Sequence, residues 1–87
     1  MSKNIKKREP FKPAPGVIFE NAGGGKFLCT SVRDSYNNCA WFTNVKTGWT
    51  FLAHGCGLYP DGTIDWDYST DGRFERAPEL DARGARA

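Results

Sequence analysis

Apolar and polar residues alternate most strictly along residues 63–68. Ile64, Trp66 and Tyr68 occupy every second position, and an aspartate lies between each of them. Because successive side chains of a strand point to opposite faces of a sheet, this period of two predicts a β-strand. We expect the three apolar side chains to face a core and the aspartates to face water.

Shorter apolar runs elsewhere predict further strands. Residues 17–20 and 26–32 flank a glycine-rich turn, and this arrangement predicts a β-hairpin. Residues 39–45 and 49–53 are two more such runs, and a tight polar connection separates them. Together the runs predict a meander of short antiparallel strands.

Two Asp-Gly pairs predict turns near the end of this meander. Residues 59–63 contain the string Pro-Asp-Gly, in which proline presets φ and glycine tolerates a positive φ. Residues 69–72 end in a second Asp-Gly pair and predict another turn. We expect a short last strand to follow at residues 73–75.

Composition favours a small β fold. The chain has 87 residues, of which 14% are aromatic, ten are glycine and five are proline. A domain of about 60 residues buries only roughly 60% of its unfolded surface, so closure of the sheet and buried rings must support it. We therefore expect an all-β fold: a small SH3-like barrel or a compact β-roll of five to six short strands, with flexible tails.

Charge divides the chain into three parts. Residues 1–16 hold five basic side chains against one glutamate, residues 17–76 hold five against seven acidic ones, and residues 77–87 are balanced. We expect a basic, proline-containing flexible leader, a small β-barrel domain and a frayed C-terminal tail, in that order. The leader is either a solvated tail or an arm that lies on nucleic acid or an acidic partner. Its basic residues are Lys3, Lys6, Lys7, Arg8 and Lys12.

The cysteines and the single histidine have the stoichiometry of a structural zinc site. These residues are Cys29, Cys39, His54 and Cys56. They contain no Cys-x-x-Cys pair, so free buried thiols or one disulfide are the competing interpretations. A nucleophilic Cys–His pair would need activating surroundings that nothing in the sequence supplies. We expect no enzymatic activity and, apart from the zinc alternative, no cofactor.

Four aspartates fall within eleven residues. They are Asp61, Asp65, Asp67 and Asp71. They form either a solvated strand face with two turn residues, an acidic patch that docks a cationic protein surface, or a site for calcium or carboxylate-pair chemistry. Neighbours on one strand face lie about 6.6 Å apart, roughly the phosphate spacing that a nucleic-acid mimic needs. The alternating pattern of a calcium-binding loop is absent.

The aromatic residues outnumber the places in a core of this size. We expect about half of the tyrosines and tryptophans to be buried. The others either belong to a core with one or two partly exposed rings or line a groove, as aromatic residues do at peptide- and base-binding faces. The candidates for a partner-binding face are Tyr36, Trp49 and Tyr59.

Three strings stand out as a signature. They are NAGGGKF at residues 21–27, GWTFLAHG at 48–55 and YPDGTIDWDYS at 59–69. In these strings the chain resembles a set of short proteins encoded by bacteriophages and prophages. The resemblance implies a viral or mobile-element origin. By analogy with small phage domains, it also implies binding and blocking of a host component, as anti-CRISPR and other anti-defence proteins do.

These patterns favour a non-enzymatic phage-type binding protein that blocks or recruits a host protein or nucleoprotein complex. The alternative is a nucleic-acid- or nucleotide-binding module that uses the basic leader and exposed rings. A marginal core with open edges would also suit a homodimer. We expect no membrane partner and a location in the cytoplasm of the bacterial host. The reasons are that no apolar run approaches roughly 18 residues and that the N-terminus lacks the apolar segment of a signal peptide.

Overall fold

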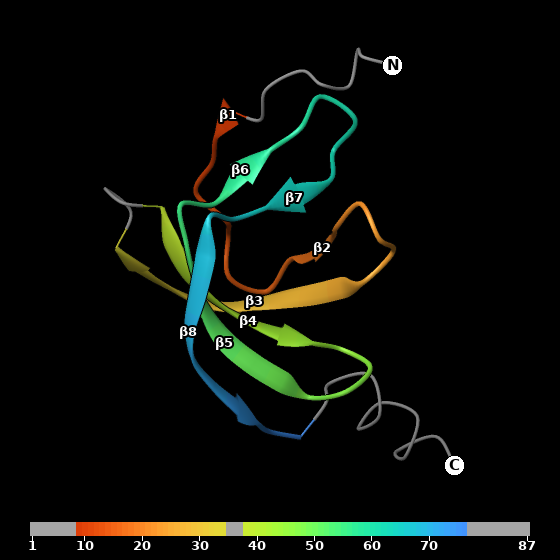
Figure 1. The fold of residues 1–87 in the computed structure, drawn as a ribbon, viewed down its shortest axis with the longest axis vertical. Helices are drawn as coiled ribbons and strands as arrows, with labels where there is room; N and C mark the ends of the chain where they lie inside the picture. Colours follow the sequence, from red (N-terminus) through yellow and green to blue (C-terminus); the bar gives the residue numbers. More distant parts are fainter. Residues whose placement is uncertain (1–8, 35–37, 77–87) are drawn as a thin grey trace.

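The computed structural model describes residues 9–34 and 38–76, which form two β-sheets (Figure 1). The larger sheet contains, in spatial order, β2 (Ile18–Glu20), β3 (Lys26–Asp34), β4 (Cys39–Asn44), β5 (Trp49–His54) and β8 (Tyr68–Phe74). The smaller sheet contains, in spatial order, β1 (Glu9–Pro10), β6 (Gly57–Leu58) and β7 (Ile64–Asp65). All pairings within the two sheets are antiparallel.

The hairpin predicted around the glycine-rich turn is confirmed, and it joins β2 to β3. The side-chain oxygen of Asn21 accepts hydrogen bonds from the backbone N–H groups of Gly23 and Gly25, at 3.1 and 2.8 Å. Gly24 has a φ of 88°, which glycine adopts without steric cost. These contacts fix the point at which the chain reverses.

β4 and β5 form the centre of the larger sheet. Phe42 is fully buried and Phe51 is 4% exposed, and the two residues lie opposite each other in the pairing. The connection between the strands is tight because the side-chain oxygen of Asn44 accepts hydrogen bonds from the N–H groups of Lys46 and Thr47. An asparagine at this position thus replaces backbone partners that the short connection lacks.

The Pro-Asp-Gly turn at residues 59–63 is also confirmed, and it joins β6 to β7. The N–H of Tyr59 donates to the carbonyl of Thr63, and the N–H of Gly62 donates to the carbonyl of Tyr59, both at 2.9 Å. The Asp61 carboxylate accepts bonds from the N–H and the hydroxyl of Thr63, at 2.9 and 2.7 Å. The turn is therefore closed by both backbone and side-chain bonds.

The continuous strand predicted for residues 63–68 is wrong. β7 ends at Asp65 and β8 begins at Tyr68, so the chain leaves the smaller sheet and enters the larger one within two residues. At the break, the Asp65 carboxylate accepts the N–H of Trp66 at 2.8 Å, which removes that donor from a ladder. Tyr68, which we expected in the core, is 60% exposed. The alternating pattern is shared between two sheets.

The turn predicted for residues 69–72 is wrong as well, because this segment is a β-bulge inside β8. The register between β5 and β8 shifts between Thr50 and Leu52, which places an extra residue on β8. Asp71 has a φ of 56°. The Asp-Gly pair therefore lies in the bulge and not in a turn. The short last strand predicted for residues 73–75 is the end of β8.

The core lies between the two sheets, and the Trp66 ring connects them. Its centroid lies 5.3 Å from that of Phe27, 5.5 Å from Phe42 and 5.1 Å from Phe51. Aromatic pairs of this kind contribute about 0.5–1.5 kcal/mol beyond the area they bury. The buried residues of the cluster are Phe27, Cys29, Ala40, Phe42, Phe51, Ala53, Cys56 and Ile64.

Residues 9–16, which we expected in a leader outside the domain, contact it instead. β1 pairs with β6, and the N–H of Phe11 donates to the carbonyl of Cys56 at 3.0 Å. The Phe11 ring meets Phe19 edge-on at 5.4 Å, and Pro13 is fully buried. The prediction failed because charges and prolines dominate this stretch, whereas two apolar side chains determine where it packs.

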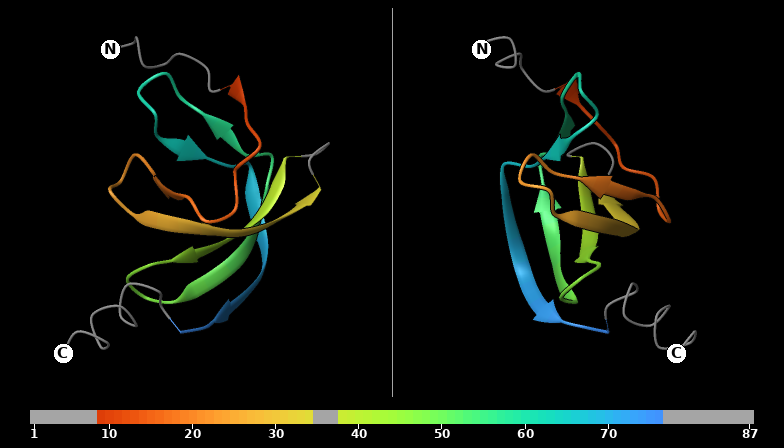
Figure 2. Two further views of the ribbon diagram at one scale, coloured as in Figure 1. Left: turned by 180° about the vertical axis from the view of Figure 1, so that it is seen from behind. Right: turned by 90° about the vertical axis from the view of Figure 1, so that its right-hand side faces the viewer.

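Over the described residues the chain is all-β, with no helix, and the two sheets fit the small barrel-like fold that the sequence predicts. Figure 2 shows how the twist of the larger sheet separates its edge strands, β2 and β8. The described part has eight strands rather than five or six, because β1 and β6 are two residues long and too short to show a period. The predicted tail at residues 77–87 lies outside the described residues. None of the elements described could span a membrane as an apolar helix.

The substitution Phe11→Ala tests the packing of the N-terminal segment. We expect it to lower the free energy of unfolding by about 2 kcal/mol, because a partly buried ring is removed from the edge of the core. The exposed neighbour provides the control, since Lys12→Ala should change stability by less than about 0.5 kcal/mol. Urea unfolding followed by tryptophan fluorescence measures both. Equal midpoints for the two variants would contradict this packing.

Candidate functional site

β8 is an exposed edge of the larger sheet (Figure 1). It pairs with β5 on one side, and no strand in the described part of the chain pairs with its other side. All seven of its residues are exposed. An edge of this length presents backbone donors and acceptors that can template a further strand. The opposite edge strand, β2, has only three residues and leads into a bridge between Asn21 and Ile64.

A glycine in the bulge allows a tryptophan to lie on β8. A Cβ atom added to Gly72 would collide with the indole ring of Trp49. The preceding residue, Asp71, is in the left-handed region, which aspartate tolerates better than most residues. The bulge therefore divides the edge into two arms, residues 68–70 and residues 73–74.

Two exposed rings lie at the second arm. Trp49 and Phe74 are opposite each other in the β5–β8 pairing, and their ring centroids are 4.8 Å apart at an angle of 65°. Trp49 is 40% exposed and Phe74 is 72% exposed. Rings that touch each other on the surface form a small apolar patch. Trp49, which the sequence marks as a partner-binding candidate, is thus at the surface.

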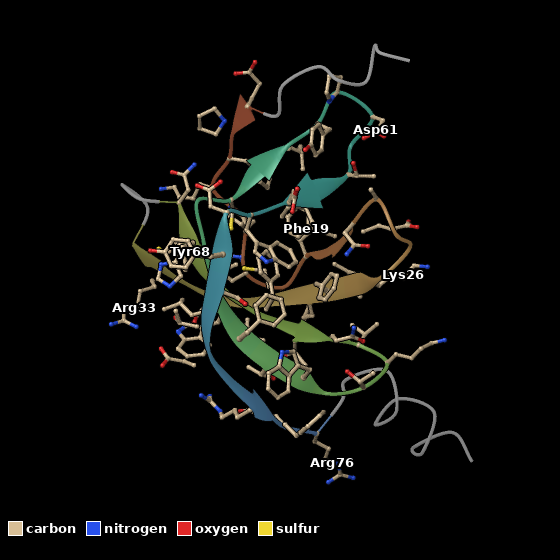
Figure 3. All side chains as sticks on the ribbon, in the orientation of Figure 1. Phe19, Lys26, Arg33, Asp61, Tyr68 and Arg76 are labelled. Carbon is tan, nitrogen blue, oxygen red and sulfur yellow. The ribbon has the colours of Figure 1, made fainter. Side chains whose placement is uncertain are left out.

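Tyr68 lies at the first arm, where β8 begins (Figure 3). Its ring stacks on the imidazole of His54, with centroids 4.5 Å apart and an angle of 8° between the planes. The two residues are direct partners in the β5–β8 register. The stack holds an exposed tyrosine ring in one position.

His54 also connects the edge strand to the middle of the sheet. Its Nδ1 atom lies 3.3 Å from the Sγ atom of Cys39 on β4, and its Nε2 atom lies 2.9 Å from the hydroxyl of Thr70 on β8. In each neutral tautomer one ring nitrogen donates and the other accepts. Side chains from three neighbouring strands therefore form one hydrogen-bonded row.

Arg73 is fixed beside the second arm. Its guanidinium carbon lies 5.0 Å from the centroid of the Trp41 ring, and its Nε atom donates to the Glu75 carboxylate at 2.6 Å. The side chains of Arg73 and Glu75 are 55% and 43% exposed, so their ion pair adds little to stability. What the two contacts do is hold the guanidinium in one place on the surface.

The four aspartates are spread over both sheets rather than along one strand face. Asp61 lies in the β6–β7 turn, far from the start of β8 in Figure 3. Asp65 ends β7, whereas Asp71 lies in the bulge of β8. Asp67 lies in the crossing, and its carboxylate would collide with a Cβ atom on Gly55. Because the strand breaks after Asp65, the spacing expected for a single strand face does not apply.

The structure does not gather the cysteines and the histidine into one site. Among the residues it describes, no three His, Cys, Asp or Glu side chains lie together so as to hold a metal ion. The three cysteines are buried and none is in a disulfide. Cys39 contacts His54, whereas the thiols of Cys29 and Cys56 point to backbone carbonyls at 3.8 and 3.9 Å. Burial raises the pKa of the Cys29 thiol.

The other candidates are dispersed. Tyr59 is half-buried, and its backbone is bonded within the β6–β7 turn. Lys12 is exposed. Tyr36 lies outside the described residues, and so do Lys3, Lys6, Lys7 and Arg8.

Sequence reasoning missed most of the β8 surface. Tyr68 was expected in the core because the alternation runs on through it, and Phe74 was expected in a separate short strand. The available signal was an Asp-Gly pair set between strand-forming residues, Tyr, Thr and Phe, since a glycine within a strand pattern can mark a bulge instead of a turn.

No family model, no curated protein and no solved structure matches this chain. The resemblance to phage proteins thus stays a prediction. Function has to be argued from the geometry of β8 and its neighbours.

The substitution Gly72→Ala tests the contact between the bulge and Trp49. We expect it to lower the free energy of unfolding by about 1–3 kcal/mol, because the added methyl group displaces the indole ring. In a Trp49→Ala background the same substitution should cost less, since the space is then empty. Gly23→Ala, where a Cβ atom meets only an ordinary contact, is the control. Denaturant unfolding of the wild type, the two single variants and the double variant measures these costs. If the costs of Gly72→Ala and Trp49→Ala simply add in the double variant, the contact is contradicted.

A second test concerns the Asp61 carboxylate. The N–H of Thr63 and, to a smaller extent, its hydroxyl donate hydrogen bonds to this carboxylate. Both lower its pKa, because they favour the charged form. Since the folded-state pKa lies below the unfolded-state pKa, the resulting stability is complete above the unfolded value and is lost as pH falls through the folded one. NMR titration of the carboxyl carbon should show the lowered pKa. Thr63→Val keeps the N–H but removes the hydroxyl, so it should raise the pKa of Asp61 part of the way back. An unchanged pKa in that variant would show that the hydroxyl does not contribute to the lowering.

Proposed function

We propose that the protein is a non-enzymatic binding protein whose partner surface is β8 with the rings beside it. The observation that carries this proposal is a seven-residue edge strand, exposed throughout, with Tyr68 60% exposed at one end and Phe74 72% exposed at the other. Backbone groups on the open side of an edge strand supply affinity for an extended partner segment, and anchoring rings supply specificity.

The side chains on this surface are already ordered. Tyr68 is stacked on His54, and Trp49 and Phe74 contact each other. Rings and guanidinium groups that are held before binding lose less conformational entropy when a partner arrives. Tyrosine, tryptophan and arginine are the residue types most enriched among binding hot spots, and Arg73 lies on this surface beside the rings.

The bulge favours binding of one partner strand over continued edge-to-edge association into a growing sheet. Bulges twist an edge strand and interrupt regular pairing, and they are a common protection against edge-to-edge aggregation. A partner strand has to match two short arms, residues 68–70 and 73–74, on either side of the distortion. That requirement supports a specific complex.

The partner we propose is a host protein, or a nucleoprotein complex that contains it, in the bacterial cytoplasm. This part rests on the resemblance of the three sequence strings to phage proteins. Occupying a host protein's free strand or strand edge would block that protein, which is the way an anti-CRISPR or other anti-defence protein would act. Nucleic acid stacked on Trp49 and Phe74, and a second copy of the chain, are the alternatives that the experiment separates.

A tagged full-length chain should retain one host protein in stoichiometric amount from lysate. The double substitution Tyr68→Ser/Phe74→Ser should reduce its recovery at least about tenfold, because two anchors each contribute about 1–2 kcal/mol. The matched control is Val17→Ser/Ile18→Ser at the other edge, where the side chains are 42% and 54% exposed. This control should leave recovery unchanged.

Three measurements complete the test. Nuclease treatment of the lysate distinguishes a protein partner from one held through nucleic acid, and light scattering on the purified chain detects a second copy. Circular dichroism establishes that both double variants are folded. Equal recovery with the wild type and the Tyr68/Phe74 variant would overturn the proposal. If nuclease treatment abolishes recovery of the partner, the surface binds nucleic acid and not a host protein, which would also overturn the proposal.

A further inference from the structure

The row Cys39–His54–Thr70 has a chemistry that the binding surface does not use. It crosses three adjacent strands, with Cys39 on β4, His54 on β5 and Thr70 on β8. The two distances along it, 3.3 Å from sulfur to Nδ1 and 2.9 Å from Nε2 to the hydroxyl, both lie within hydrogen-bonding reach. A thiol, a base and a group that orients the base are therefore in line.

This order of groups is the one that activates a nucleophile. In the tautomer with hydrogen on Nε2, that N–H donates to the Thr70 hydroxyl and Nδ1 accepts the Cys39 S–H. His54 is then placed to take the thiol proton as the sulfur attacks an electrophile. Thr70 acts as a positioning residue, since its hydroxyl holds the ring in the productive tautomer.

The position of the imidazole is fixed from a third side. The Tyr68 ring stacks on it with centroids 4.5 Å apart and nearly parallel planes. With both nitrogens bonded and one face covered, the ring has little freedom to turn away from the sulfur. The contact between Cys39 and His54 is thus a built feature of the sheet and not a chance contact of two flexible side chains.

The other two cysteines have different surroundings. Cys29 and Cys56 are 0% and 1% exposed, and their thiols point to backbone carbonyls. A carbonyl oxygen is a poor proton acceptor compared with imidazole, so it does not assist attack by the sulfur. Cys39 is 5% exposed and has a base beside it. The three thiols of this chain should therefore differ in reactivity.

We propose that Cys39 is an oxidation site for small hydroperoxides, activated by His54. The sulfur attacks one oxygen of hydrogen peroxide while its proton passes to Nδ1 of His54. The S–O bond forms and the O–O bond breaks, and the leaving hydroxide takes the proton from Nδ1 and departs as water. Cys39 is oxidised to sulfenic acid and the peroxide is reduced. The small exposed fraction of Cys39 restricts the site to an oxidant of about this size.

The experiment treats the reduced, full-length protein with hydrogen peroxide and traps sulfenic acid with dimedone. Peptide mass spectrometry then gives a rate for each cysteine. We expect Cys39 to be labelled at least about tenfold faster than Cys29 or Cys56. The same measurement in urea gives the rates of the unassisted thiols. Cys39 should react faster in the folded protein than in urea, although folding buries it.

Variants of the row distinguish assistance from mere access. His54→Gln, which keeps hydrogen-bonding groups but is no base at neutral pH, should slow Cys39 at least about tenfold. Thr70→Val, which removes the hydroxyl, should slow the reaction of Cys39 by a smaller factor. Thr70→Ser, which keeps a hydroxyl, should react at the wild-type rate. Because Thr70 is exposed, its two variants test the row even where His54→Gln does not fold.

Three results would overturn the proposal: equal labelling of the three cysteines in the folded protein, a folded-state rate for Cys39 below its rate in urea, or an unchanged rate in a folded His54→Gln variant. None of these measurements involves a binding partner. Failure of the partner experiment and failure of this one are therefore independent.

Discussion

The packing of Trp66 against three phenylalanines is the contact on which the two-sheet arrangement depends. Phe27, Phe42 and Phe51 come from three strands of the larger sheet, whereas Trp66 directly follows the smaller one. A domain of this size has too little apolar area for two separate cores. One ring shared by both sheets solves that problem. β8 starts two residues later, so the position of the exposed edge is set by the same ring.

The fold could be predicted where local chemistry decides the backbone, and not where the choice is between sheets. The turns after Asn21 and after Pro60 are determined by glycines and by side chains that bond their own backbone. A period of two says that a strand exists and which side chains share a face. It does not say that Tyr68 belongs to a different sheet from Ile64, because that depends on where Trp66 finds partners.

The candidate site was harder to predict because it is assembled across strands. The aspartates are dense along the chain, and the three cysteines with His54 have the stoichiometry of a zinc site. Neither property states which residues are neighbours in space. Cys39, His54 and Thr70 meet because β4, β5 and β8 are adjacent in a particular register, and a one-residue slip of one strand would turn all of its side chains to the other face.

The pairing of β1 with β6 has a consequence for how the chain assembles as it is synthesised. The hairpins β2–β3 and β4–β5 close short loops and need only neighbouring residues. β1 leaves the ribosome before β6, yet it must wait for β6 to pair, and most of the described residues lie between the two strands. Closing so long a loop costs more entropy and slows folding. Phe11 and Pro13 therefore find their places late, after the larger sheet has begun to form, although they are made before the strands of that sheet.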